Sequence, residues 1–396
     1  MKKVLSSILA LAMLLCALVS IITVDTLAAD EPPTSGQCGD DVWYTYDSNT
    51  HMLTIFGTGP MWDFEIIPRI SSNRPWNEWV KTVVVKEGVT SIGDMAFYET
   101  RIESIQLPES LESIGDKAFH MGDNLIAEIT IPKNVRFIGT NAFTYTEIKE
   151  FQVGAQNKWF RSVGGVLFTV DMKTLITYPC ASQTKHYAVP QGVEIIKESA
   201  FYPRGSRYLE TISFPDSLRI IEMSAFQEQR GLRDVHLPPN LEYLGRGCFL
   251  VVNSFSCIEI PATMIEIENE AFFAIKDLNE IYFLGAPPIL GEEIYWLAPE
   301  DLTLYYPTVL ADAWAPNGEI TYQGYNIAPY SYERGDANCD GKVSAADAAA
   351  ILRHLVKLTP LFLRGIKVAD VTGDGQITAA DAARILRWLV RLESSL

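Results

Sequence analysis

Two stretches near the C-terminus carry oxygen-bearing side chains at alternating positions around a glycine. The first, Gly335 to Asp347, reads GDANCDGKVSAAD, and the second, Asp370 to Asp381, reads DVTGDGQITAAD and repeats its register 34 residues later. Carboxylate, amide and hydroxyl oxygens are hard donors that suit Ca²⁺, and they are numerous enough here for six or seven contacts without histidine or thiolate. The spacing therefore predicts two calcium-binding loops.

In each loop the predicted ligands occupy the first, third, fifth, seventh, ninth and twelfth positions. At the seventh position a backbone carbonyl binds the ion, and at the sixth position a glycine, Gly341 or Gly375, allows the sharp turn. The predicted metal-binding residues are Asp336, Asn338, Asp340, Lys342, Ser344, Asp347, Asp370, Thr372, Asp374, Gln376, Thr378 and Asp381. The alternative is a pair of Asp-Gly turns that cap helices, but two copies in one register favour metal binding.

These loops depart from a standard EF-hand pair, because position twelve is Asp in both and a clear helix is predicted only after each loop. The pattern, within residues 335–396, resembles a type I dockerin. The resemblance implies a small helical module with two structural Ca²⁺ ions that docks into a cohesin domain of a scaffoldin. Because so small a module has little core, ion binding is expected to supply folding free energy.

In dockerins the partner is selected mainly by residues ten and eleven of each loop and by positions on the following helix. The resemblance assigns this role to Ala345, Ala346, Leu352, Arg353, Lys357, Ala379, Ala380, Leu386, Arg387 and Arg391. A solvated helix face is the alternative for the basic residues. The charge favours docking, because residues 335–396 carry eight Lys or Arg against seven Asp or Glu in an otherwise acidic chain.

The two halves of the module are similar but not identical. His354 and Trp388 occupy matching positions, and this difference argues against equal use of the two docking faces. Thr372 stands where Asn or Asp is usual, so we expect weaker calcium binding at the second loop.

Most of the remaining chain repeats one phrase: an apolar residue, two or three mostly polar residues, and Ala-Phe. Successive copies are 22, 24, 58, 25, 23 and 23 residues apart and end at Phe97, Phe119, Phe143, Phe201, Phe226, Phe249 and Phe272. The 58-residue gap indicates one degenerate copy. Cys248 replaces the alanine in one copy, so we interpret it as a small core residue. Alternating segments that end in proline, such as IQLP from Ile105, predict a strand after each phrase.

These repeats resemble the BspA-like, or Treponema-type, class of leucine-rich repeats. The resemblance implies a curved solenoid with a strand ladder on one face, and family members act in adhesion and surface binding. One unit is too small to bury its own apolar face, so the Ile and Ala-Phe of each copy are expected to form a stacked core. Ser162 to Pro179 resembles a hairpin insertion of that class, with strands expected at Val166–Phe168 and Leu175–Tyr178.

The predicted fold class is α+β and multidomain: a β-rich leucine-rich repeat solenoid followed by a small all-α calcium-binding dockerin. Val42 to Trp62 predicts a hairpin that caps the first repeat, since an exposed solenoid end would leave strand edges open. Aromatics in the segment after the repeats are expected to pack a second cap, with a sugar-stacking platform as the alternative. The predicted divisions are 1–29 signal peptide, 30–82 N-terminal β-hairpin cap, 83–284 repeats, 285–334 C-terminal cap and short linker, and 335–396 dockerin.

The N-terminus is typical of a secretory signal peptide, with Lys2 and Lys3, an apolar run from Val4 to Val24 and small residues up to Ala29. A retained anchor helix is the alternative, and no later segment is apolar enough to span a membrane. Cleavage would change the net charge from -17 to -18, which argues against nucleic acid and anionic membranes as partners. We expect a secreted, extracellular protein, held at the cell surface through a scaffoldin. The five remaining cysteines are odd in number and irregularly spaced, so they predict neither a disulfide framework nor a zinc site.

Two functions remain open. The preferred one is a non-catalytic binding or adhesion subunit whose solenoid recognises a protein or polysaccharide. The alternative is a carbohydrate-active enzyme, similar to a glycoside hydrolase, that acts in polysaccharide degradation. No nucleophile elbow, HExxH motif or phosphate-binding glycine loop appears, and acids that recur at repeat positions are expected to form a solvated face. A pocket with two carboxylates about 5–10 Å apart would favour the enzyme, and a smooth solenoid face would favour binding.

Overall fold

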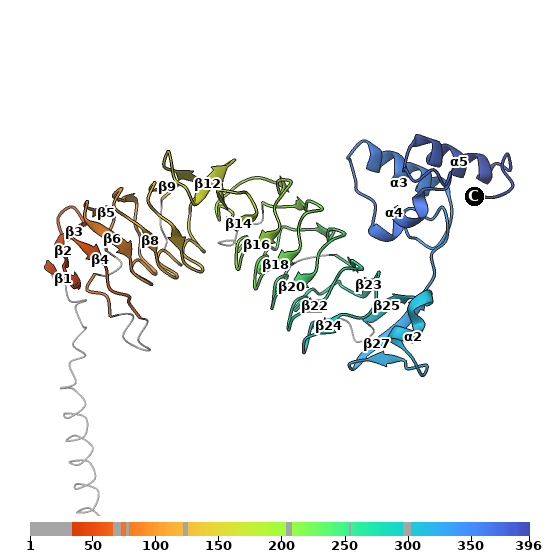
Figure 1. The fold of residues 1–396 in the computed structure, drawn as a ribbon, viewed down its shortest axis with the longest axis horizontal. Helices are drawn as coiled ribbons and strands as arrows, with labels where there is room; N and C mark the ends of the chain where they lie inside the picture. Colours follow the sequence, from red (N-terminus) through yellow and green to blue (C-terminus); the bar gives the residue numbers. More distant parts are fainter. Residues whose placement is uncertain are drawn as a thin grey trace, which may run out of the picture.

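The chain forms a curved β-solenoid followed by a small helical module (Figure 1). The computed structural model describes residues 34–65, 73–76, 79–121, 126–202, 208–252, 255–295 and 302–396. The signal peptide predicted at residues 1–29 lies outside these ranges. Within them, none of the helices is long and apolar enough to cross a membrane.

An antiparallel sheet closes the N-terminal end of the solenoid. Strands β2 (Val42–Asp47) and β3 (Met52–Gly57) form the predicted hairpin, and β1 (Ser35–Gly39) adds a strand that the sequence pattern did not indicate. Asp47 accepts hydrogen bonds from the Asn49 amide and the Thr50 hydroxyl, which fixes the turn. Strand β3 then pairs in parallel with the first repeat strand, so the hairpin covers the end of the stack.

Each repeat contributes two short strands, which pair in parallel with the equivalent strands of neighbouring repeats. The first set, most of whose strands lie in or next to a proline-ended segment, is β5 (Thr82–Val85), β7 (Ser104–Gln106), β9 (Glu128–Ile131), β11 (Glu150–Val153), β15 (His186–Ala188), β17 (Thr211–Ser213), β19 (Asp234–Val235), β21 (Cys257–Ile260) and β23 (Glu280–Phe283). The second set is β4 (Gly59–Pro60), β6 (Val89–Ile92), β8 (Ser113–Ile114), β10 (Phe137–Ile138), β14 (Thr174–Thr177), β16 (Ile195–Ile196), β18 (Ile220–Ile221), β20 (Tyr243–Leu244), β22 (Glu266–Ile267) and β24 (Ile289–Leu290). The expected ladder is therefore accompanied by a second one, built from the apolar residues that open each phrase.

The Ala-Phe residues form the stacked core that the repeat predicts. The phenylalanines are almost fully buried and their rings stack from repeat to repeat, with centroids 5.3 Å apart for Phe97 and Phe119 and 5.2 Å apart for Phe226 and Phe249. Tyr178 stacks on Phe201 at 4.9 Å, so it takes the phenylalanine place of the degenerate copy in the long gap. Cys248 is fully buried, as expected for a core residue, and burial raises the pKa of its thiol.

The insertion in the long gap is a three-stranded antiparallel arrangement of β12 (Phe160–Val163), β13 (Val166–Thr169) and β14. The sequence predicted β13 and β14 within one residue at their ends but not β12. The insertion divides the solenoid core into two clusters of buried side chains, one that ends at Leu167 and one that begins at Val166.

The segment after the repeats continues the stack and closes it. Strands β25 (Thr303–Pro307) and β27 (Tyr325–Tyr330) extend the β21–β23 sheet in parallel. Trp314 is buried, stacks on Tyr306 and donates from Nε1 to the Gly285 carbonyl at 3.0 Å. Cap packing is thus confirmed for these aromatics, while Trp296 lies outside the described residues. The remaining elements of the cap are η1 (Thr308–Leu310), α2 (Ala311–Trp314) and β26 (Thr321–Tyr322).

The C-terminal module contains three helices: α3 (Ala345–Leu355), α4 (Leu363–Ala369) and α5 (Ala379–Leu389). Helices α3 and α5 follow the two loops, as predicted, and pack against each other. Helix α4 directly precedes the second loop and corrects the prediction that a helix lies only after each loop. The core of the module is small and contains Ala337, Ala348, Ile351, Leu361, Ala369, Val371, Ala382 and Ile385.

Candidate functional site

The first predicted calcium loop is organised around two aspartates. Asp347 is fully buried and accepts hydrogen bonds from the amides of Asn338 at 3.0 Å and Ser344 at 2.7 Å. Asp336 accepts from the amides of Asp340 and Gly341, both at 3.0 Å. These contacts hold the carboxylates at the first and twelfth positions inside the loop, so that the two ends of the loop are tied together.

The second loop repeats this arrangement. Asp381 is fully buried and accepts from the amides of Thr372 at 2.9 Å and Thr378 at 2.8 Å. Asp370 accepts from the amides of Asp374 and Gly375 at 3.2 and 2.8 Å. The two loops therefore share their hydrogen bonds as well as their sequence pattern. Two unrelated Asp-Gly turns would not need to share them.

The backbone conformation explains the glycines at position six. Gly341 and Gly375 have φ angles of 79° and 83°, which side chains with a Cβ rarely adopt. Position four is also left-handed in both loops, with φ of 61° at Cys339 and 77° at Gly373. The ligand spacing identified the turn at position six but not the one at position four. Gly373 is the signal for it in the second loop, whereas in the first loop a cysteine, Cys339, adopts the strained conformation.

Position nine has a second role that ligand spacing does not reveal. The side chains of Ser344 and Thr378 accept hydrogen bonds from the amides two residues later, at 3.1 and 3.2 Å, and each begins a helix through a capping box with the position-twelve aspartate. The loops and the docking helices are thus one hydrogen-bonded unit, and disturbance of a loop is expected to reach its helix.

The electrostatics of the first loop suit a cation. Burial raises the pKa of Asp336, and the charges of Asp347 and Asp340 act in the same direction. In the second loop burial acts to raise the pKa of Asp370, but amide donors led by Gly375 hold it below its usual value. In the described part of the chain, no group of three or more His, Cys, Asp or Glu side chains is placed to hold a metal. The predicted calcium set also uses amide, hydroxyl and backbone carbonyl oxygens, and this mixed donor set fits calcium chemistry.

All ten residues predicted to select the partner are exposed on the module. Leu352 and Leu386 expose 44% and 42% of their surface, at matching positions of α3 and α5. The other eight exposed residues are Ala345, Ala346, Arg353, Lys357, Ala379, Ala380, Arg387 and Arg391. Helix α4 lies on the side of the module that faces the solenoid, and α3 and α5 lie farther from it (Figure 1). Both predicted docking faces are therefore accessible to a partner.

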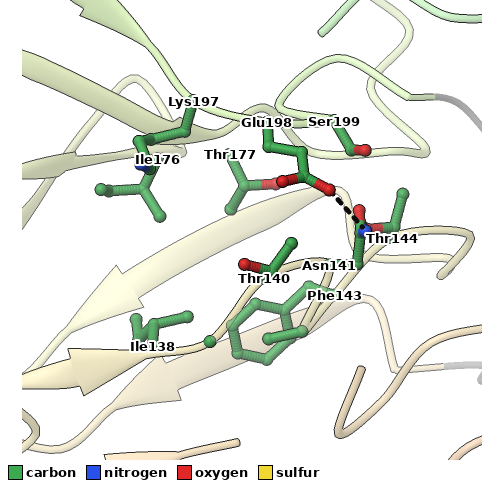
Figure 2. A pocket seen from close by; sticks show the side chains of 12 residues that line it. Ile138, Thr140, Asn141, Phe143, Thr144, Ile176, Thr177, Lys197, Glu198 and Ser199 are labelled. Carbon is green, nitrogen blue, oxygen red and sulfur yellow. Dashed lines mark hydrogen bonds between the residues drawn. The ribbon is translucent and has the colours of Figure 1, made fainter. Parts of the chain in front are cut away.

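The solenoid contains a small pocket of about 70 Å³, partly open to solvent, where β10 and β14 approach each other beside the insertion (Figure 2). Glu198 points toward the Asn141 amide nitrogen, 3.5 Å away, and burial raises the pKa of this carboxyl. Glu198 is the one carboxylate among the twelve lining residues. The pair of carboxylates that glycoside hydrolysis requires is therefore not present in the lining of this pocket.

A shallow groove beside this pocket is rich in acids, but two of them are engaged in ion pairs. Glu222 pairs with Lys197 at 2.9 Å and Glu242 pairs with Arg219 at 2.5 Å, each from one repeat to the next. The groove is open to solvent and also contains Glu198 and Glu266. Glu222 and Glu242 are partly exposed to solvent, and exposed pairs of this kind contribute little to stability.

Changing Thr372 to Asn is expected to raise the calcium affinity of the second loop about fivefold. The Thr372 hydroxyl donates to Asp381 Oδ1 at 2.9 Å. Asn338, at the same position of the first loop, has a side-chain amide oxygen that accepts from the Asp340 amide, and Thr372 lacks such an oxygen. Calorimetric titration of the unmodified chain should resolve a tight and a weak site, and Thr372→Asn should bring them closer. Thr378→Ser, which keeps the hydroxyl at position nine, is the control. Two equal sites in the unmodified chain, or a tighter second loop, would contradict the prediction.

Comparison with known proteins identifies both parts of the chain. A family described as BspA type leucine rich repeat region matches six copies over residues 76–163 and 178–296, more than half of the chain. A family described as dockerin type I domain matches residues 334–389. A search of curated proteins found no match.

The solved structures that match this chain are distant in sequence. The pneumococcal vaccine antigen PcpA is 17% identical, with a TM-score of 0.47, over 74% of this chain and 100% of that one. A leucine rich cell surface protein from Faecalibacterium prausnitzii is 17% identical, with a TM-score of 0.47, over 78% and 97% of the two chains. A leucine-rich repeat protein from Eubacterium ventriosum is 19% identical, with a TM-score of 0.41, over 65% and 86%.

The repeats and the dockerin support a non-catalytic binding component of cellulosome type that is extracellular or at the cell surface. Type I dockerins generally bind calcium and have a cohesin as partner. The chain therefore belongs to the BspA type leucine rich repeat family and carries a type I dockerin domain at its C-terminal end.

Proposed function

We propose that this protein is a secreted binding or adhesion subunit attached through its dockerin to a cohesin domain of a scaffoldin, in a cellulosome-type complex at the cell surface. The observation that carries the proposal is the C-terminal module, in which two hydrogen-bonded loops lead into two helices whose predicted docking residues are exposed. The module is slightly basic and the rest of the chain is acidic, so an acidic cohesin surface would be drawn to the module.

Calcium has a structural role in this proposal, with one ion in each loop. The ligands are the side chains at positions one, three, five, nine and twelve and the backbone carbonyls of Lys342 and Gln376. Bound calcium neutralises the crowded carboxylates of each loop and holds the start of the following helix, so that the docking residues of α3 and α5 keep their places.

The N-terminal part, from the cap through the repeats, acts in this proposal as the binding surface for a protein or polysaccharide. Its support is an exposed aromatic pair on the outer face of the cap: Trp43 and Phe56 are register partners on β2 and β3 and expose 40% and 39% of their surface. Exposed aromatic faces suit stacking on sugar rings or burial against another protein. The division at residues 30–82, 83–284, 285–334 and 335–396 separates this surface from the attachment module.

Removal of residues 335–396 is expected to abolish capture by an immobilised scaffoldin cohesin and to leave binding of the solenoid to its protein or polysaccharide ligand intact. Capture is measured by pull-down in calcium. Leu352→Asp with Leu386→Asp in the full chain should also abolish capture, because a charge at each docking face must be desolvated at the interface. The control is Leu358→Asp, at a position that is 74% exposed and outside the predicted docking set.

Capture that survives both the deletion and the double variant would overturn the docking proposal. Release of reducing sugar ends from a polysaccharide by the full chain would instead support the alternative function, a carbohydrate-active enzyme. The two readouts are independent, so each function is tested separately.

A further inference from the structure

The dockerin is joined to the solenoid by a buried ion pair as well as by the chain. Arg364 on α4 donates from Nε to Glu259 Oε1 at 2.5 Å, and its backbone amide donates to Oε2 at 3.2 Å. The side chains of Arg364 and Glu259 are only 11% and 4% exposed. A buried charge left without its partner is strongly unfavourable, so each residue requires the other once the two surfaces meet.

The solenoid side of this contact is an aromatic platform. Glu259, Tyr282 and Tyr305 are register partners on neighbouring strands β21, β23 and β25, and thus form one row on the outer face of the sheet. The guanidinium carbon of Arg364 lies 3.3 Å from the centroid of the Tyr282 ring. The Tyr330 ring, which meets the Tyr282 ring edge-on, has its centroid 5.7 Å from the same carbon. A guanidinium that stacks on a ring while it binds a carboxylate is tightly specified, and lysine could not replace it.

Further contacts surround the ion pair. The rings of Phe362 and His236 lie 4.9 Å apart, and Lys367 Nζ donates to the Tyr332 hydroxyl at 3.2 Å. On the module side, a Cβ at Gly365 would clash with the Ala337 carbonyl oxygen, so α4 packs directly on the backbone of the first calcium loop. Helix α4 therefore connects the solenoid to the loop.

The junction between the two parts is also held in place. Tyr332 bonds through its hydroxyl to Tyr330, the last residue of β27, at 3.0 Å. Arg334 donates to the Val371 carbonyl at 3.0 Å, and the Gly335 amide donates to the Val368 carbonyl at 2.9 Å. So short a connection keeps α4 at high effective concentration near the platform, which favours the docked arrangement.

We propose that the outer face of the β21–β23–β25 sheet is a docking surface for the chain's own dockerin. Arg364 secures this contact, and the docked dockerin presents α3 and α5 outward in one fixed orientation. The dockerin is thus a rigid extension of the solenoid and not a mobile appendage. The fixed orientation deepens the proposed function and rests on it, because the outward faces of α3 and α5 are the ones proposed to bind cohesin. A cohesin that binds either face would then place the solenoid in one defined direction on the scaffoldin.

Two native cysteines flank the contact and report on it. Cys257 lies two residues before Glu259 on β21, and Cys339 in the first loop has its Sγ 3.5 Å from the Cβ position of Gly365. The docked arrangement should therefore protect the Cys339 thiol from alkylation.

The test compares the full chain with Arg364→Ala and Glu259→Gln, with calcium and without cohesin. We expect Cys257 and Cys339 to react with iodoacetamide about tenfold faster in both variants, as followed by mass spectrometry. Small-angle X-ray scattering should show a wider range of shapes. Helical circular dichroism should stay unchanged, which shows that the module is still folded. Arg161→Ala, which removes an exposed arginine on β12, is the matched control and should behave as the unmodified chain.

The proposal is overturned if both variants react and scatter as the unmodified chain does. It is also overturned if the unmodified chain already shows rapid alkylation of Cys257 and Cys339. Because no cohesin is present, a failure here leaves the proposed function standing. If the cysteines of the unmodified chain are protected but the chain is not captured by a cohesin, that result would count against the proposed function alone.

Discussion

Replacing both position-twelve aspartates, Asp347→Ala with Asp381→Ala, is expected to unfold the dockerin and leave the solenoid folded. Each carboxylate is fully buried and accepts two loop amides. A buried amide left without its acceptor costs about 1–3 kcal/mol. The two amides at each aspartate are part-buried, so each substitution costs up to about 2–6 kcal/mol before any loss of calcium. A module of this size rarely has more than about 3–5 kcal/mol of stability in total. The double variant should therefore exceed what the module can tolerate.

Circular dichroism at 222 nm measures this result, because α3, α4 and α5 contain most of the helical residues of the described chain. The helical signal should disappear while the β-sheet signal remains. Lys342→Ala is the control within the same loop, since the seventh position is predicted to contribute only its carbonyl. A double variant that keeps its helical signal in excess chelator would show that neither the aspartates nor calcium holds the module together.

The two loops and their helices could be predicted from sequence because every signal for them is local. Ligand types alternate around Gly341 and Gly375, and Ser344 and Thr378 each begin an amphipathic segment. Helix α4 has no such signals. It starts after Phe362 without a side-chain cap and includes a glycine, which is unfavourable in a helix interior. Contacts with the solenoid and the first loop stabilise it, and no local pattern contains that information.

Apart from β14, the second strand set was missed for a related reason. Most of its strands have two residues, such as Ile220–Ile221 and Tyr243–Leu244, which is too short to show alternation. They become strands because stacking places equivalent residues of successive repeats in register. The contact between Glu259 and Arg364 is harder still, since the residues are 105 positions apart. The repeat pattern of the solenoid does not indicate which outward-facing glutamate forms an ion pair with the dockerin.

Phe226→Ala is expected to destabilise the solenoid by about 3–5 kcal/mol, the usual cost of deleting a fully buried phenylalanine ring. Phe226 is fully buried between Phe201 and Phe249, with ring centroids 4.7 and 5.2 Å away, and Phe214 contacts its edge. Repeats contact only their neighbours, so a cavity here weakens the coupling between the stacks on either side. Urea unfolding followed by circular dichroism at 218 nm should show a lower midpoint and a broader transition than the unmodified chain.

The matched control for this substitution is Phe137→Ala on β10, where the side chain is 56% exposed. Away from the core, such a change should alter the free energy of unfolding by less than about 0.5 kcal/mol. The contrast separates ring stacking from loss of an aromatic residue as such. Equal effects of the two substitutions would mean that the phenylalanine stack does not hold successive repeats together, and that the two ladders of parallel strands carry the stability of the solenoid instead.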